Sequence, residues 1–328
     1  MSGALDLPWL EPTTHQLDRS IESGRFGHAP LISGPPGTGK RALADWLALR
    51  LLCLDPKDGH ACGQCKSCAL SDSGTHPDFF RLDILEDKTV ILVEQVRTLI
   101  DRLNLTPSIG TRRVGLIPSA DHMNLNAANA LLKTLEEPSD EIWLILVSDK
   151  AEQLPATIRS RCQRVTLPVP TEQDATDWLK QRTDTTDVED LTMALRLAEG
   201  SPSKALIWLE QGQIELANSI RDHLDAMLRD GTSQARVVDT WLDHPHRSWH
   251  WLARWSQAWL QKTLTGHADG LEQAATLVSG PESLQLLQDC WLRALEGGRL
   301  AEKPIRQEWM MQSWALAWQR LANRVERG

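Results

Sequence analysis

Three glycines and one lysine between residues 34 and 41 constrain the fold of this chain more than any other feature. The octapeptide reads Gly-Pro-Pro-Gly-Thr-Gly-Lys-Arg. It follows the apolar run 31–33, which predicts a short buried strand, and leads into segment 39–54, whose Ala, Leu and Arg content predicts a helix. A strand, a glycine-rich loop and a helix in this order predict a phosphate-binding loop rather than a Gly/Pro turn without a ligand.

The expected phosphate contacts come from the loop backbone and from one side chain. Glycine lets N–H groups turn inward around phosphate oxygens, and the start of the helix adds a favourable partial positive charge. The lysine of such a loop reaches the outer phosphates of a nucleotide. The predicted nucleotide-binding residues are Gly34, Gly37, Thr38, Gly39 and Lys40.

The residues that should hold magnesium in such a site are missing. Arg41 stands where the pattern has Ser or Thr, and a guanidinium offers no oxygen to a cation. The next apolar run, 113–117, should end in an Asp that holds the metal, with a Glu after it in many families. It is followed instead by Pro118 and Ser119, and Asp121 lies three residues beyond Pro118. Two losses at one metal site predict that the chain does not hydrolyse a nucleotide in its own pocket.

Three further segments carry motifs that occur together in one protein family. Residues 127–138 read Ala-Ala-Asn-Ala-Leu-Leu-Lys-Thr-Leu-Glu-Glu-Pro, residues 157–162 contain Ser-Arg-Cys, and residues 75–78 read Thr-His-Pro-Asp. Over roughly residues 25–205 the chain resembles the clamp-loader ATPases of the AAA+ class, and bacterial members in particular. The resemblance implies an α/β fold class: an AAA+ P-loop core with a parallel sheet, a small helical lid domain and a C-terminal all-α collar domain.

The same resemblance shows what this chain lacks. The active gamma/tau paralogues of the family carry the P-loop Ser or Thr, an Asp-Glu pair and an arginine in a Gly-Ser-x-Arg-x-Ala-Leu run of the lid. Here residues 200–206 read Gly-Ser-Pro-Ser-Lys-Ala-Leu, with Ser203 at the arginine position. Ser148 matches the polar sensor position after the apolar run 144–147. The resemblance therefore implies a non-hydrolysing member of the family.

One catalytic element of the family is retained. Arg161 lies between Ser160 and Cys162 in the Ser-Arg-Cys motif. The resemblance implies that Arg161 is an arginine finger, which projects into the ATP site of a neighbouring subunit and stabilises the transferring phosphoryl group there. Such fingers contribute on the order of 10³–10⁵ in rate in GTPase–activator pairs. The alternative is an ordinary solvated basic turn made by Arg159, Arg161 and Arg164.

Four of the six cysteines lie close together in the sequence. Cys62, Cys65 and Cys68 follow a C-x2-C-x2-C pattern, and Cys53 lies nine residues before it. Four thiolates complete a closed tetrahedral zinc site, and they also suit an iron–sulfur cluster. The family resemblance favours zinc, in a structural role because protein ligands fill every position.

Two nearby histidines and the two other cysteines of the chain are not needed for this site. His60 and His76 are surplus to the ligand set, and Cys162 and Cys290 are predicted to be small packing residues. The sequence shows no secretory signal or membrane-spanning stretch, which predicts a reducing, cytoplasmic location without disulfides and no membrane partner.

Turn-forming sequences divide the chain into three expected domains. A Leu-Pro-Val-Pro-Thr stretch ends the nucleotide-fold core, which spans residues 1–166 and contains the zinc-binding insertion 53–68. A helical lid is expected over residues 167–208, and a helical oligomerisation (collar) domain over residues 209–328.

Most of the 14 tryptophans lie in the expected collar domain. Trp251, Trp255 and Trp259 recur at helical spacing, and Trp314 and Trp318 repeat the step. We expect this stripe to be mainly core and helix–helix packing. Two alternatives are that part of it faces neighbouring subunits, since tryptophan is favoured in interface anchors, or that it stacks on bases.

Charge limits the functions that remain. A net charge of −9 excludes a general polyanion binder, so contacts with nucleic acid must be local or shared with other subunits. The resemblance implies a non-hydrolysing subunit that joins gamma/tau and delta subunits in a heteropentamer, as an accessory part of DNA polymerase III. That complex opens a sliding clamp and places it on primed DNA. Two other hypotheses are an autonomous AAA+ ATPase and a zinc-dependent nucleic-acid-binding module.

Overall fold

The computed structural model describes most of the chain. The described residues are 6–86, 88–137, 141–184, 187–229, 234–266 and 281–325. Pro138, the last residue of the 127–138 motif, lies outside them.

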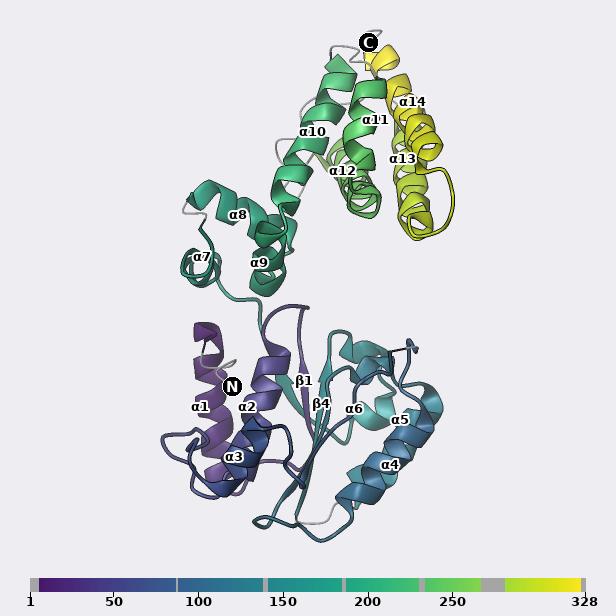
Figure 1. Ribbon diagram of the computed structural model, residues 1–328. Coiled ribbons are helices and arrows are strands. Elements are labelled where there is room, and N and C mark those ends of the chain that lie inside the picture. Colours follow the sequence, from purple (N-terminus) through teal and green to yellow (C-terminus); the bar gives the residue numbers. More distant parts are fainter. Residues whose placement is uncertain are drawn as a thin grey trace. The chain divides into compact units, whose positions relative to one another are not determined.

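The chain forms two compact units (Figure 1). The first contains residues 1–184 and 200–204, and the second contains residues 185–199 and 205–328. The three-domain division at 166/167 and 208/209 stays a prediction.

A five-stranded parallel sheet forms the centre of the first unit (Figure 1). Its strands are β1 (Pro30–Ser33), β2 (Phe79–Arg81), β3 (Arg113–Ile117), β4 (Ile142–Ser148) and β5 (Gln163–Thr166). Their order across the sheet is β2-β3-β4-β1-β5. Apolar residues fill β3 and β4 almost continuously, as expected for parallel strands that are covered on both faces. The apolar runs of the sequence are therefore confirmed as strands.

Helices cover both faces of this sheet. Helices α1, α2 and α3 lie on one side, and α4 and α5 lie on the other (Figure 1). The helices of the first unit are α1 (Glu11–Glu22), α2 (Lys40–Leu52), α3 (Lys66–Asp72), α4 (Val93–Leu103), α5 (Leu125–Glu136), α6 (Ala156–Arg159) and α7 (Glu172–Lys180). Short 3-10 turns span Pro8–Leu10, Ala120–His122 and Ala151–Gln153. This layered arrangement around a P-loop confirms the predicted α/β fold of the AAA+ class.

The sheet order decides which loops meet. In β1, Ser33 pairs in register with Ser148 of β4 and Thr166 of β5. The carboxyl ends of these three strands therefore lie side by side. After β1 the chain forms β2 and β3 on one side of the sheet, and it then returns as β4 and β5, which lie on either side of β1. The carboxyl ends of these strands are therefore a switch point, where ligands of open α/β sheets bind.

The second unit is entirely helical in its described part. It contains α8 (Val188–Leu197), most of α9 (Pro202–Glu210), α10 (Gln213–Arg229), α11 (Gln234–Leu242), α12 (Pro245–Thr265), α13 (Pro281–Leu300) and α14 (Gln307–Val325). The described part of the chain holds no helix with the length and apolarity that crossing a bilayer requires.

The tryptophan stripe forms the core of this second unit. Trp251, Trp255 and Trp259 of α12 are buried, and so are Trp314 and Trp318 of α14. The rings of Trp314 and Trp318 stack at 5.4 Å between centroids, and the Trp259 ring meets that of Trp318 edge-on, also at 5.4 Å. The packing interpretation is confirmed, and for these five side chains the interface and base-stacking alternatives are wrong.

Candidate functional site

The glycines of the P-loop are required by its backbone. Gly37 has φ 72° and Gly39 has φ 95°, in the left-handed region where side chains are disfavoured. A Cβ at Gly37 would overlap the hydroxyl of Ser201, and one at Gly39 would lie 2.6 Å from a methyl group of Leu7. Helix α2 begins directly after this turn, at Lys40. The loop is therefore closely surrounded by the rest of the first unit.

The loop keeps backbone donors for an anion. In the described residues, the N–H groups of Gly37, Thr38 and Gly39 donate to no protein acceptor. The Thr38 hydroxyl donates to the carbonyl of Pro35 at 2.9 Å. Free N–H groups at the start of a helix are the means by which a P-loop holds phosphate oxygens.

Lys40 is fully engaged by protein oxygens. Its side chain is only 4% exposed. Nζ donates to the carbonyl of Gly34 at 2.8 Å and to the carbonyl of Pro35, and it lies 2.7 Å from Oδ1 of Asp149. An ammonium group has three N–H donors. These three oxygens therefore account for all of them.

Arg41, at one of the two positions that should supply a magnesium ligand, contacts Ser119, the residue after the other, Pro118. Nη2 of Arg41 donates to Oγ of Ser119 at 3.1 Å. Ser119 follows β3 at the place where a hydrolysing P-loop protein needs a carboxylate. A cationic guanidinium therefore lies beside a neutral hydroxyl, where magnesium needs several anionic or neutral oxygens.

A cavity of about 460 Å³ opens in front of the loop. Both cations, Lys40 and Arg41, line it, together with the carboxylates of Asp121 and Asp149 and with Ser203. Asp121 reaches the wall because the 3-10 turn Ala120–His122 follows β3 so closely, a path that the sequence did not reveal. Ser203 lies at the wall, but it offers a hydroxyl where the family has an arginine.

The sensor position is separated from this cavity. Ser148 is buried at the end of β4, and its Oγ accepts the N–H of Lys150 at 3.1 Å. The next residue, Asp149, is the one that reaches Lys40, and the sequence analysis did not single it out. Its position directly after an apolar strand was the available signal.

Arg161 lies on the turn between α6 and β5, apart from the P-loop cavity. Its side chain is 35% exposed, and Nη2 pairs with Oε1 of Glu136 at 2.5 Å. Nη1 also donates to the carbonyl of Thr157 at 3.0 Å. Ser160 is exposed and Cys162 is half-buried beside it. The guanidinium is therefore held at the surface by its own turn and by one acidic residue of α5.

The four clustered cysteines come together around one point. Cys53 caps the end of α2, Cys65 caps the start of α3, Cys68 lies within α3, and Cys62 lies in the connecting loop. All four sulfur atoms are within 4.8 Å of one another. The Cys53–Cys65 and Cys53–Cys68 Sγ distances are 3.9 and 3.7 Å. A tetrahedral site with zinc–sulfur bonds of about 2.3 Å has sulfur–sulfur edges of about 3.8 Å. The group could therefore hold a metal ion.

Backbone N–H groups already point at these sulfur atoms. The Cys62 N–H donates to Sγ of Cys53 at 3.2 Å, and the Cys65 and Cys68 N–H groups donate at 3.4 Å to Sγ of Cys62 and Cys65. Burial alone raises the pKa of Cys65, but the N–H donors of Cys68 and Leu54 and the neighbouring thiols lower it to about 6. Burial and the neighbouring thiols raise the pKa of Cys68 to about 12. A bound cation would favour the thiolate at every position.

The nearby histidines serve other contacts. His60 Nδ1 accepts the indole N–H of Trp46 at 3.0 Å, and His76 Nε2 lies 2.8 Å from the hydroxyl of Ser67. Both are surplus to the sulfur cluster, as predicted. Burial raises the pKa of Cys162 to about 11 and that of Cys290 to about 12, as expected for packing thiols.

A buried carboxylate joins the cysteine-containing segment to the sheet. Asp78 is fully buried, accepts the N–H groups of Ser108 and Ile109, and lies 3.4 Å from Nη2 of Arg113. The backbone N–H of Asp78 also donates to Nδ1 of His76 at 3.1 Å. The Thr-His-Pro-Asp motif is thus a structural anchor, a role that the sequence alone did not reveal.

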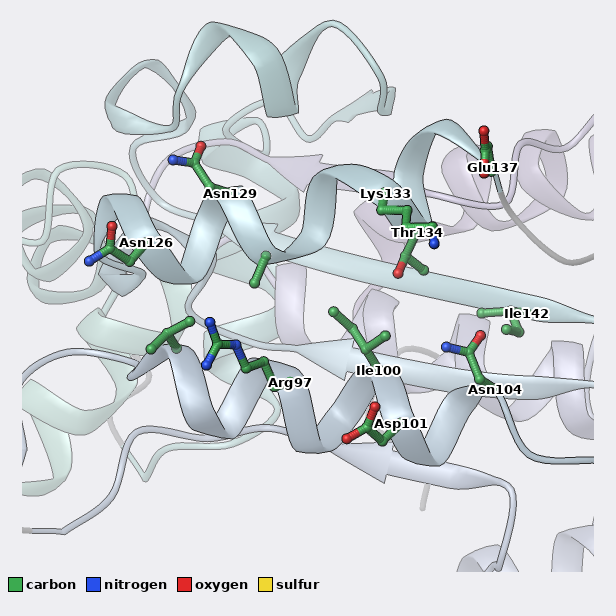
Figure 2. Close-up of a pocket in the computed structure, with 12 residues that line it drawn as sticks. Arg97, Ile100, Asp101, Asn104, Asn126, Asn129, Lys133, Thr134, Glu137 and Ile142 are labelled. Atoms are coloured by element: carbon green, nitrogen blue, oxygen red, sulfur yellow. The ribbon is translucent and has the colours of Figure 1, made fainter.

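A second cavity, of about 700 Å³, lies between α4 and α5. Figure 2 shows polar side chains of both helices along it. Arg97, Asp101 and Asn104 come from the α4 side, and Asn129 and Lys133 come from α5. None of the predicted site residues lines this groove.

Comparison with known proteins finds similarity to subunits of DNA polymerase III. A family model described as "DNA polymerase III, delta subunit" matches residues 9–171. DNA polymerase III subunit delta' of Pseudomonas aeruginosa is 37% identical over 265 residues, which cover 80% of this chain and 80% of the relative. Subunit delta' of Escherichia coli is 36% identical over 246 residues, 75% of this chain and 73% of the relative. Subunit tau of Bacillus subtilis is 30% identical over 230 residues, 69% of this chain and 40% of the relative.

Proposed function

The chain belongs to the DNA polymerase III delta' family, and from this membership we propose that it is a non-hydrolysing subunit of the polymerase's clamp loader. In this role it works in the cytoplasm with gamma/tau and delta subunits in a heteropentamer, which opens a sliding clamp and places it on primed DNA during replication. The chain itself catalyses no reaction and is an accessory subunit of a DNA-directed DNA polymerase. Similarity to delta' subunits over most of their length supports this role.

The contact between Arg41 and Ser119 carries the non-hydrolysing part of the proposal. It joins the loop position that should give magnesium a hydroxyl to the position where many families have a Glu, and Pro118 stands where the metal-holding Asp should be. Magnesium demands a nearly octahedral set of oxygens, and the fixed cation of Arg41 repels it at short range. Without the metal, charge that develops on the phosphoryl oxygens has no adequate partner in this pocket.

Two carboxylates in the cavity wall are the local support for the autonomous ATPase hypothesis. Asp149 is paired with Lys40 and is therefore not free to hold a metal. Asp121 lines the cavity, but no P-loop hydroxyl stands beside it to complete a magnesium site, because position 41 is an arginine. The non-hydrolysing role fits this geometry better.

Arg161 is proposed to act in trans on a neighbour's nucleotide. Its support is the Ser-Arg-Cys motif together with its surface position, since only a partly exposed guanidinium can reach another subunit. Glu136 holds it in the isolated chain, and a phosphoryl group with greater negative charge competes for the same guanidinium. In this role Arg161 stabilises the transition state and takes no part in binding a nucleotide to its own chain.

Zinc is proposed as the ion of the cysteine cluster. Four thiolates around one point leave no ligand position open, so the ion's role is structural. The cluster ties the end of α2, the helix that follows the P-loop, to the start of α3. The sulfur ligands alone do not distinguish zinc from an iron–sulfur cluster.

The C-terminal helices, residues 209–328, are proposed to form the collar that holds the pentamer together. Apolar side chains remain exposed on this unit, and the most exposed aromatic of them is Trp309 at 63%. Leu292 and Leu295 of α13 and Leu316 of α14 are exposed as well. Exposed apolar side chains on a helical unit favour subunit contacts.

Reconstitution tests the proposed function. Gamma/tau and delta subunits are mixed with or without this chain, and assembly is followed by native mass spectrometry and clamp loading by a labelled clamp on primed DNA. We expect a pentamer and efficient loading only when the chain is present. Equal loading without it would contradict a role as a clamp-loader subunit.

A further inference from the structure

A carboxylate that the proposed function does not use lies against the lysine of the P-loop. Asp149 follows Ser148 at the end of β4, and β4 pairs with β1, the strand that leads into the loop. Oδ1 of Asp149 lies 2.7 Å from Nζ of Lys40. The lysine side chain is 4% exposed and the aspartate side chain is 50% exposed, so a buried cation is paired at the mouth of the cavity.

This contact uses the last free donor of the lysine. The carbonyl groups of Gly34 and Pro35 take two N–H donors of Lys40, and Asp149 takes the third. In a loaded phosphate-binding loop, the lysine reaches the outer phosphates of the nucleotide. Here an anion from the chain itself holds that place.

The rest of the loop still resembles an anion site. The N–H groups of Gly37, Thr38 and Gly39 have no acceptor among the described residues, and Arg41 adds a second cation to the wall of the 460 Å³ cavity. A polyphosphate would therefore find donors in place. What opposes it is the negative charge of Asp149 beside Lys40 and the loss of the lysine's third donor.

We propose that the carboxylate of Asp149 is an internal ligand of the P-loop, which takes the place of a nucleotide's outer phosphate at Lys40. The ion pair keeps Lys40 and the loop in their closed arrangement with no nucleotide bound, and it excludes nucleoside di- and triphosphates from the cavity. The inference deepens the proposed non-hydrolysing role. It rests on that role in one respect, namely that the P-loop pocket binds no magnesium. It does not depend on the role of Arg161.

Equilibrium binding of a fluorescent ADP to the full chain, in EDTA, tests this inference. Asp149→Asn removes the charge and keeps the size of the side chain. Asp121→Asn is the matched control, because Asp121 lines the same cavity without an ion pair to Lys40. We expect Asp149→Asn to bind at least about tenfold more tightly than the wild type, and Asp121→Asn to change the affinity by less than about threefold.

Thermal melting gives a second readout. Asp149→Asn leaves the buried Lys40 ammonium without its partner, so its melting temperature is lower than that of the wild type, and saturating ADP raises it again. ADP leaves the melting temperature of the wild type unchanged. If Asp149→Asn is recovered in too small an amount, Asp149→Ser is measured in the same way.

Three results would overturn the inference: tight ADP binding by the wild type, no gain in affinity for either Asp149 variant, or an equal gain for Asp121→Asn. The last would assign the exclusion to the overall charge of the cavity. Failure of the non-hydrolysing proposal is seen separately, as magnesium-dependent phosphate release by the wild type.

Discussion

The two candidate sites of the first unit differ in how complete their sets of ligand residues are. The cysteine cluster has every ligand that a structural metal site needs, and its sulfur atoms stand within 4.8 Å of one another. The P-loop has a correct backbone and the correct lysine, but its metal positions hold Arg41 and Pro118, and Asp149 pairs with the lysine. Helix α2 links the two sites, since it begins at Lys40 and ends next to Cys53.

This difference separates two uses of the same fold. In the proposed non-hydrolysing role the P-loop serves as a packing element, in which Gly37 allows close approach of Ser201 and protein oxygens accept every donor of Lys40. A metal ion held by the four cysteines would stiffen the loop between α2 and α3 and would need no open ligand position. In the proposed role, a subunit that offers Arg161 to a neighbour requires a rigid frame more than it requires a working pocket of its own.

The largest expected effect comes from the complete site. Cys65→Ala removes one of the four thiolates, and structural zinc contributes about 10–16 kcal/mol of apparent binding free energy in zinc-finger peptides. We expect bound zinc to fall from one equivalent per chain to none, with early proteolysis of segment 53–68. Metal analysis and limited proteolysis measure this, and Cys162→Ala, outside the cluster, serves as the control.

Retention of one equivalent of zinc by Cys65→Ala would break the assignment. Iron and visible absorption in the freshly purified wild type would replace zinc with an iron–sulfur cluster.

The next effect concerns Arg161, the proposed arginine finger. In a reconstituted loader, Arg161→Ala should slow hydrolysis at the adjacent ATP site by on the order of 10³-fold while assembly stays intact. DNA-stimulated phosphate release and native mass spectrometry measure the two properties. Arg164→Ala, an exposed arginine of β5 close to the same turn, is the control. Equal rates for wild type and Arg161→Ala would contradict the arginine-finger role and favour the solvated basic turn.

Two glycines with similar backbones compare the surroundings of the two sites. Gly37 of the P-loop has φ 72° and touches Ser201, whereas Gly63 of the cysteine segment has φ 70° and open space around it. Alanine at either position should cost about 1 kcal/mol of stability from backbone strain alone. Gly37→Ala should cost more, because Ser201 must move, and Ser201→Gly should restore most of the excess. Melting curves of Gly37→Ala, Gly63→Ala, Ser201→Gly and the Gly37→Ala/Ser201→Gly double variant measure this. Equal losses for both glycines would contradict the close packing at Gly37.

The smallest expected effect is on ATP hydrolysis in the chain's own pocket. Arg41→Ser restores the P-loop hydroxyl, but Pro118 and Ser119 still offer no carboxylate at the end of β3. We expect no magnesium-dependent turnover of ATP above that of the wild type. Turnover by Arg41→Ser would show that Asp121, which lines the cavity, can complete the metal site.

The sequence predicted the parts that depend on local order. The strand, loop and helix around Lys40 and the cysteine pattern of residues 53–68 each lie within one short segment, so spacing alone indicated their structure. Helix α2 was expected over 39–54 and spans Lys40–Leu52. The buried tryptophans followed from helical periodicity in the same way.

Contacts across the sheet were beyond such arguments. Asp149 meets Lys40 because β4 lies beside β1, and nothing in the spacing of 109 residues between them gives that strand order. The approach of Ser201 to Gly37 and the pairing of Glu136 with Arg161 depend on the fold in the same way. Chain order gives the candidates, whereas sheet order decides which of them meet.

The most direct test is phosphate release from magnesium-ATP by the purified chain alone, at high protein concentration and with primed DNA and the sliding clamp present. The account predicts a rate no higher than that of a sample whose Lys40 has been changed to alanine. Steady, magnesium-dependent release that Lys40→Ala abolishes would contradict it, because the chain's own pocket would then be a working ATPase.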